Sequence, residues 1–155
     1  MAVADRLEQL GLELPPVPQP AGAYVPAVVT GNLVFTAGQL PFVDGALPET
    51  GLVGEGEGQV PPSRAADLAA LCALNALAAV AEAIGGLDRV SQVVKVTGFV
   101  ASASGFTAQP TVLNGASQLL GDLFGDDGRH ARSAVGVAAL PLGSPVEVEL
   151  VLEYR

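Results

Sequence analysis

The stretch that decides the fold reads ARSAVGVAALPLGSPVEVELVLEY and covers residues 131–154. It predicts two strands, 131–140 and 146–154, because the prolines between them interrupt a strand ladder. In the second strand two sets of side chains alternate: Val146, Val148, Leu150 and Leu152, and Glu147, Glu149, Val151 and Glu153. A period of two places the sets on opposite faces. We therefore expect a sheet with one face in the core.

A hairpin is predicted towards the N-terminus. Residues 24–30 and 33–37 are apolar and β-branched, and Gly31-Asn32 between them tolerates the positive φ of a tight turn. A further strand is expected at 92–100, where β-branched residues alternate. These segments, with the two C-terminal strands, would form a single sheet.

Two long helices are predicted between the strands. The first runs from about Pro62 to Ile84, with Pro in its first turn and Gly85-Gly86 as its stop. It is apolar around nearly its whole circumference, which indicates burial on most sides. The second covers 110–124, with Thr107 as its candidate cap.

The element order β-β-α-β-α-β-β predicts an α+β fold in which two helices cover one face of a mostly antiparallel or mixed sheet. The other face is rich in Val and has nothing from the same chain to cover it. An exposed apolar sheet face usually packs against another subunit. We therefore expect an oligomer.

The 155 residues are expected to form one domain, 1–155. Residues 1–22 are expected to hold a short helix, 2–11, and a Pro-rich extended segment. Residues 44–59 are rich in Gly and Glu and predict a long loop or a ragged hairpin. Such loops are either solvated connections or mobile lids over a site.

Charge and composition exclude several kinds of partner and cofactor. The net charge is −9 with a single Lys, so nucleic acid and anionic membranes are disfavoured as partners. One Cys and one His, Cys72 and His130, make a zinc cluster implausible, and no nucleotide-binding glycine motif is present. We expect no metal and no cofactor. The N-terminus lacks a signal-peptide pattern, which favours a cytoplasmic protein.

Arg132 is the residue most indicative of chemistry. It lies among small and apolar residues in a predicted strand, so if it is buried it needs an anionic partner. One interpretation is a bidentate grip on a ligand carboxylate, with Glu147, expected at the start of the neighbouring strand, holding a water or acting as base. The alternative is an internal ion pair of Arg132 with Glu147 or Glu149.

Three motifs in this order resemble the Rid family, the YjgF-like reactive intermediate deaminases. The first is Tyr24-Val-Pro with Gly31-Asn-Leu-Val-Phe-Thr-Ala-Gly-Gln-Leu-Pro41. The second is Phe106 followed by Val112-Leu-Asn114. The third is the strand–turn–strand stretch of 131–149. Together they cover most of the chain from Tyr24 to the C-terminus.

The resemblance implies a chorismate-mutase-like fold of the bacillary type and a homotrimer with sites in the clefts between subunits. It implies hydrolysis of 2-imino or enamine acids, such as 2-aminoacrylate, to 2-oxo acids and ammonia. Carried over by position, Arg132 would bind the substrate carboxylate and Glu147 would activate water. Substrate-binding positions would be Tyr24, Ala37, Gly38, Asn114 and Ala134.

Three positions depart from the deaminase pattern. Ala134 stands where such members carry Cys, Ala37 where they carry Ser, and Gly136 where they often carry Glu. The pocket would thus lose polar groups and gain room. This leaves open a second function, binding of a small carboxylate or 2-oxo acid without turnover. The family's ribonuclease-style naming offers a third, which the −9 charge disfavours.

Overall fold

The computed structural model describes residues 1–20 and 22–155, so Ala21 of the N-terminal extension lies outside it. The helices are α1 (Val3–Gln9), α2 (Pro62–Ile84) and α3 (Gln109–Phe124). The strands are β1 (Ala27–Thr30), β2 (Leu33–Thr36), β3 (Val90–Ala101), β4 (Ala131–Val137) and β5 (Val146–Tyr154). Short 3₁₀ turns occupy Leu87–Arg89, Gly125–Gly128 and Pro141–Gly143.

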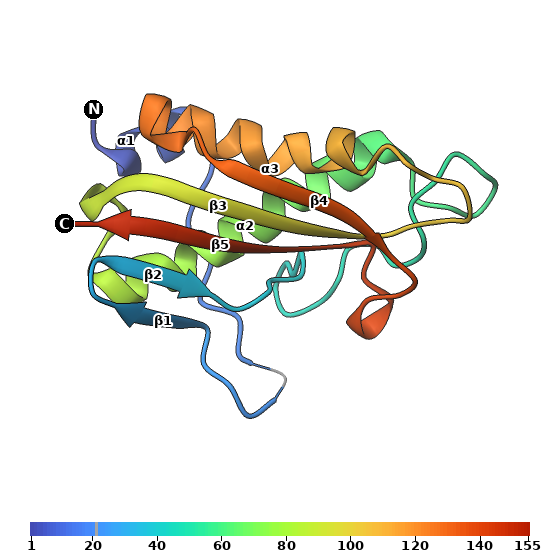
Figure 1. The fold of residues 1–155 in the computed structure, drawn as a ribbon, viewed down its shortest axis with the longest axis horizontal. Coiled ribbons are helices and arrows are strands. Elements are labelled where there is room, and N and C mark those ends of the chain that lie inside the picture. Colours follow the sequence, from blue (N-terminus) through green and yellow to red (C-terminus); the bar gives the residue numbers. More distant parts are fainter. Residues whose placement is uncertain (21) are drawn as a thin grey trace.

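The five strands form one mixed sheet in the order β1-β2-β5-β3-β4. The pairings are antiparallel except that of β3 with β4, which is parallel. α2 and α3 lie on one side of this sheet, with α2 crossing behind the strands and α3 running along β4 (Figure 1). The expected α+β arrangement, with two helices on one face, is confirmed.

The core lies between the sheet and these helices. Val146, Val148, Leu150 and Leu152 of β5 are at most 1% exposed, as their alternation predicted. Helix and sheet approach closely at Gly98, where a Cβ would lie 2.0 Å from a methyl carbon of Leu113. α2 is long and apolar enough to span a membrane, but 67% of its most apolar window is buried inside the protein, as in a core helix.

The opposite face of the sheet is open and apolar at its margins. Val28 of β1 pairs with Phe35 of β2, and their side chains are 53% and 41% exposed. Val135 of β4 is 42% exposed on the same face. No other part of the described chain covers these side chains, in agreement with the expected uncovered face.

Local rules located α2 accurately and α3 to within one residue, but they misassigned the residue that caps α3. Gly85 adopts φ 89° and ends α2, as expected of a helix-stopping glycine. Thr107 does not cap α3: the capping position is Ala108, and no side-chain hydrogen bond caps the helix there. β1 begins at Ala27 rather than Tyr24, and β4 ends at Val137 rather than Leu140.

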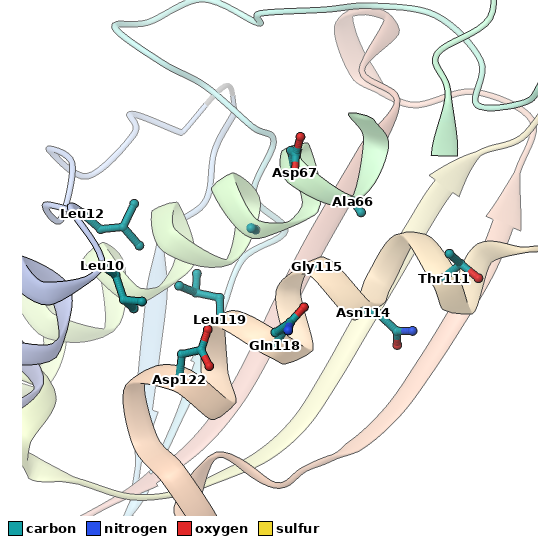
Figure 2. A pocket seen from close by; sticks show the side chains of 11 residues that line it. Leu10, Leu12, Ala66, Asp67, Thr111, Asn114, Gly115, Gln118, Leu119 and Asp122 are labelled. Carbon is teal, nitrogen blue, oxygen red and sulfur yellow. The ribbon is translucent and has the colours of Figure 1, made fainter. Parts of the chain in front are cut away.

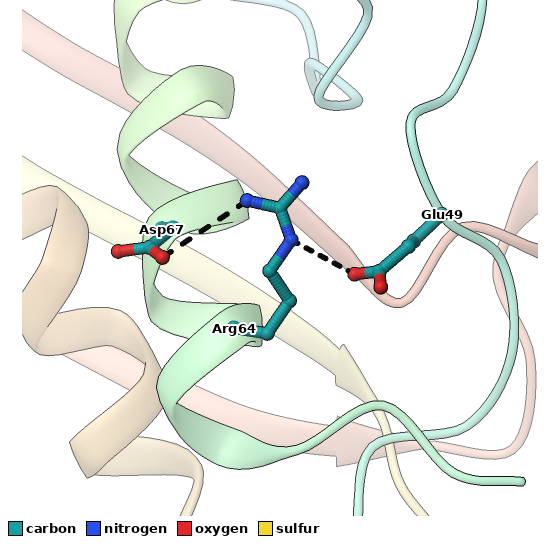
Figure 3. A network of polar contacts seen from close by, with 3 residues as sticks. All are labelled: Glu49, Arg64 and Asp67. Carbon is teal, nitrogen blue, oxygen red and sulfur yellow. Dashed lines mark hydrogen bonds and ion pairs between the residues drawn. The ribbon is translucent and has the colours of Figure 1, made fainter.

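The 44–59 loop is tied to the rest of the fold at two points, Val53 and Glu49. Val53 is fully buried; its N–H donates to Ala101 O at 2.7 Å, and it accepts from the Ala103 N–H at 2.9 Å. Arg64 at the start of α2 holds the loop through Glu49, with 3.0 Å between Nε and Oε2 (Figure 3). Val53 thus forms a β-bridge with Ser102, the residue that follows β3. The loop is therefore not a free, fully solvated connection.

Candidate functional site

Arg132 lies at the edge of the sheet, on the face that the helices cover. Its Cα pairs with Val96, which in turn pairs with the buried Leu150. Partners in register point to one face, so the Arg132 side chain extends towards α3. The guanidinium meets three acceptors there: Nη1 donates to Asn114 Oδ1 at 2.8 Å and Ser117 Oγ at 3.1 Å, and Nη2 to Pro110 O at 3.4 Å.

None of these acceptors carries a charge. The expected alternative, an ion pair of Arg132 with Glu147 or Glu149, is wrong: the salt bridges within residues 1–20 and 22–155 join other side chains. A guanidinium has five N–H donors, and three are used. The Nε–H and one Nη2–H remain for a ligand.

Two small residues follow Arg132 on the same face of β4. Ala134 pairs with Gly98 and packs half-buried against the core. At Gly136 the room expected from the missing side chain is already occupied. A Cβ there would lie 2.7 Å from Gln109 Nε2 and 3.0 Å from Ser102 Oγ. The missing side chain at position 136 therefore adds no room to the site.

Glu147 lies on the opposite, open face. Its Cα pairs with Phe99, which pairs with the exposed Val135. The carboxylate leans over Gly38, where a Cβ would be 2.0 Å from Oε1. Only glycine fits this approach without moving the glutamate. Burial, and then the charge of Glu149 on the same face, raises the pKa of the Glu147 carboxyl.

Ala37 and Gly38, which were also predicted, lie on the Glu147 side. Ala37 and Gly38 follow β2 and are half-buried. The Ala37 N–H donates to Pro26 O at 2.8 Å, which joins this segment to the one that carries Tyr24. Tyr24 is 51% exposed, just before β1.

One chain therefore holds two separate groups rather than one site. The first, which we call the arginine group, is Arg132, Asn114, Ser117 and Ala134; the second, the glutamate group, is Glu147, Gly38 and Ala37. The expectation that Glu147 lies on the strand next to Arg132 is wrong, because β3 separates β4 from β5. The two groups lie on opposite faces of the sheet.

A hollow of about 460 Å³ opens on the outer side of the helical layer (Figure 2). Its walls come from α2, α3 and the segment after α1. The lining residues are Leu10, Leu12, Ala66, Asp67, Ala70, Thr111, Asn114, Gly115, Gln118, Leu119 and Asp122. Asn114 is the one member shared with the arginine group, and neither Arg132 nor Glu147 lines this hollow.

Sequence reasoning missed four residues around Arg132. Pro110, Asn114 and Ser117 are spaced four and three apart, which is the spacing of one helix face, but only Asn114 was expected. Gln109 and Ser102 were not expected either. The spacing becomes informative only once β4 is known to pack beside α3.

The two remaining candidate side chains are Cys72 and His130. Cys72 is fully buried, and burial, followed by the charge of Glu147, raises the pKa of its thiol. His130 Nδ1 lies 3.0 Å from the carbonyl oxygen of Ala131. Within the described chain no three His, Cys, Asp or Glu side chains gather into a metal site.

A five-stranded mixed sheet with two long helices on one face and an edge-strand arginine defines a YjgF-like class of protein. The family described as "YjgF/chorismate mutase-like, putative endoribonuclease" matches residues 4–154. The chain belongs to this YjgF, or Rid, family.

Individual proteins are also similar to this chain in sequence or structure. Protein TCP17 of Trypanosoma cruzi is 45% identical over 158 residues, covering 99% of this chain and 94% of that protein. A solved structure from Shewanella oneidensis, described as a "putative endoribonuclease", has a TM-score of 0.93 at 33% identity, covering 99% of both chains. Escherichia coli TdcF, solved with bound serine, has a TM-score of 0.64 at 26% identity, covering 90% of this chain and 94% of its own.

Proposed function

We propose that the protein hydrolyses 2-imino or enamine acids to 2-oxo acids and ammonia, with Arg132 holding the substrate carboxylate. The observation that supports this most is the arrangement of the guanidinium. Three neutral acceptors orient it, no carboxylate within residues 1–20 and 22–155 forms a salt bridge with it, and two of its N–H groups stay available. A carboxylate is the ligand that a guanidinium takes in a bidentate fork.

Hydrolysis of an imine needs little from the protein beyond positioning the substrate and the water and transferring protons. Water adds through its oxygen to the electrophilic imine carbon, and Glu147 accepts the proton that the water loses. The imine nitrogen gains a proton, which gives a neutral carbinolamine. Its amino group then takes up a second proton while its hydroxyl gives one up through Glu147. The C–N bond breaks as the C=O bond forms, so ammonia leaves and a 2-oxo acid remains. The raised pKa of Glu147 makes its carboxylate a better proton acceptor than an ordinary glutamate.

Two chains are needed for both groups to meet at one substrate. Arg132 and Glu147 lie on opposite faces of a single sheet, so we propose that neighbouring subunits of a homotrimer bring one group each to a shared cleft. The exposed Val28, Phe35 and Val135 provide apolar surface for this assembly. TdcF, whose structure contains serine, shows that a relative holds a small molecule with a carboxylate.

A second function, binding of a 2-oxo acid without turnover, is favoured by one feature of this chain. The position beside Arg132 that is Cys in deaminase members is Ala134, and Ala37 replaces Ser on the glutamate side. Neither alanine can hold the attacking water. Both functions use Arg132, so they differ only in whether ammonia is released.

The test is hydrolysis of freshly generated 2-iminobutyrate and 2-iminopropionate. We expect the native protein to accelerate ammonia release and Arg132→Ala to abolish the acceleration. Arg129→Ala is the matched control, because Arg129 is exposed and pairs only with Asp126 at 3.7 Å. Absence of acceleration, together with a rise in melting temperature on adding 2-oxobutyrate that Arg132→Ala loses, would establish the binding function instead.

A further inference from the structure

Gln109 holds the start of α3 against the end of the sheet. Its Nε2 donates to Phe106 O at 2.8 Å and to Ser102 Oγ at 3.1 Å. The Ser102 hydroxyl in turn donates to Val100 O at 2.8 Å. Because Phe106 O can only accept, the amide orientation is settled, and both of its N–H groups are used.

These bonds stand where a helix cap is missing. Ala108 occupies the capping position of α3 and has no side chain able to accept a backbone N–H. Pro110 at the second helical position has no N–H to offer. The side chain of Gln109, the first residue of the helix, therefore fastens a helix start that ordinary capping leaves loose.

The strand side of this contact is equally specific. The backbone N–H of Ser102 donates to Val137 O at 3.1 Å, which ties the hydroxyl to the end of β4. Gly136 lies beside both polar groups, with the space of its missing Cβ filled by Gln109 Nε2 at 2.7 Å. Glycine at 136 is what allows the amide to sit between α3 and β4.

The position of the start of α3 affects Arg132, because two of the acceptors of Arg132 belong to this helix. Pro110 O, which accepts from Arg132 Nη2 at 3.4 Å, belongs to the residue after Gln109. Asn114, which accepts from Nη1 at 2.8 Å, lies little more than one helical turn further on. A shift of the helix start would move both acceptors relative to the guanidinium.

We propose that Gln109, Ser102 and Gly136 form a latch that positions the α3 acceptors and so sets the orientation of Arg132 for a carboxylate. Gln109 is a positioning residue here, since it acts through Pro110 and Asn114 and touches no reacting atom. The kinetic consequence rests on the proposed function, whereas the orientation of Arg132 does not.

The first experiment records the Nε–Hε NMR signal of Arg132 without ligand, assigned by its loss in Arg132→Lys. Gln109→Glu, which keeps the size but cannot donate to Phe106 O when ionised, is expected to shift or broaden that signal. Gly136→Ala is expected to do the same, because its methyl would strike the amide. Gln118→Glu on the same helix is the matched control, since Gln118 is exposed and its side chain makes no hydrogen bond within the described chain.

The second experiment measures 2-oxobutyrate binding and, where imine hydrolysis is found, KM and kcat. Looser positioning of a carboxylate-binding arginine weakens ground state and transition state alike, so KM is expected to rise about tenfold with kcat nearly unchanged. The double variant Gln109→Ala, Gly136→Ala is expected to bind no more weakly than Gly136→Ala, because removing the amide makes room for the methyl.

An Arg132 signal that superimposes on that of the native protein in both Gln109→Glu and Gly136→Ala would overturn the latch. So would additive effects on binding in the double variant. If the signal shifts as expected but no imine is hydrolysed, the latch stands and the proposed reaction fails. A loss of melting temperature alone, with the signal unmoved, would reduce Gln109 to a structural role.

Discussion

Arg132 and Glu147 point to opposite faces of the same sheet, with β3 between the strands that carry them. Each side chain nevertheless has a local environment that suits a role in binding or proton transfer. The arginine is oriented by uncharged acceptors, and the glutamate is partly desolvated over Gly38. Under the proposed function, Arg132 and Glu147 would act on one substrate only where two copies of the chain meet.

A site shared between chains predicts complementation. Arg132→Ala and Glu147→Gln are each expected to be inactive, and assemblies formed by co-expressing the two are expected to recover activity. With equal amounts and random assembly, about one quarter of the clefts would combine an intact arginine with an intact glutamate from the neighbour. Imine hydrolysis by the co-purified, differently tagged chains measures this. Complete inactivity of the mixed assemblies would place both residues in one chain's site.

The open face predicts where assembly is vulnerable. Phe35 is 41% exposed and pairs with Val28 on one side and Val151 on the other. Phe35→Glu would bury a charge in the contact, so light scattering is expected to show smaller particles at micromolar concentration. Leu10→Glu is the control, because Leu10 is 43% exposed but lines the hollow on the helical side. Equal dissociation by both variants would contradict an interface on the open face.

Elements governed by local rules were predicted well. α2 was expected from Pro62 to Ile84 and has those bounds, because Pro at its start and a left-handed glycine at its end act over one turn. The alternation in β5 also identified its buried set of side chains correctly. Thr107 shows the limit, because a nearby hydroxyl predicted a cap and the protein fastens α3 with Gln109 instead.

Relationships that depend on strand order were not predictable in the same way. Nothing between Arg132 and Glu147 in the sequence says that β3 inserts between their strands. The contacts of Arg132 with α3 depend on the parallel pairing of β4 with β3, which brings together residues far apart in the chain. Val53 was missed for a related reason, since a single bridging residue has no period to detect.

Two glycines of α3 make a matched pair for stability. A Cβ on Gly115 would lie 1.9 Å from the backbone oxygen of Ala66 on α2, the crossing visible in Figure 2. Backbone cannot yield as a side-chain tip can, so Gly115→Ala is expected to lower the free energy of unfolding by about 3 kcal/mol. Gly121 has nothing within 4 Å of its Cβ position, and Gly121→Ala is expected to raise it by about 0.5–1 kcal/mol. Denaturant titration distinguishes the two, and a loss at both positions would contradict the tight crossing.

The raised pKa of Glu147 predicts how stability depends on pH. Burial, and then the Glu149 charge, raises this pKa in the folded protein, so folding favours the protonated carboxyl. That stabilisation is complete below the ordinary glutamate pKa of about 4.3 and is lost as pH rises through the folded value. Glu147→Gln removes the ionisation, so it is expected to unfold at higher denaturant than the native protein at neutral pH. The gain is at most about 1 kcal/mol, because the side chain is only half-buried, and it should disappear at acid pH.

Glu82→Gln, on an exposed position of α2, provides the control for a general change of charge. An equal gain in both variants would assign the effect to the net charge of −9 rather than to the partly desolvated site over Gly38.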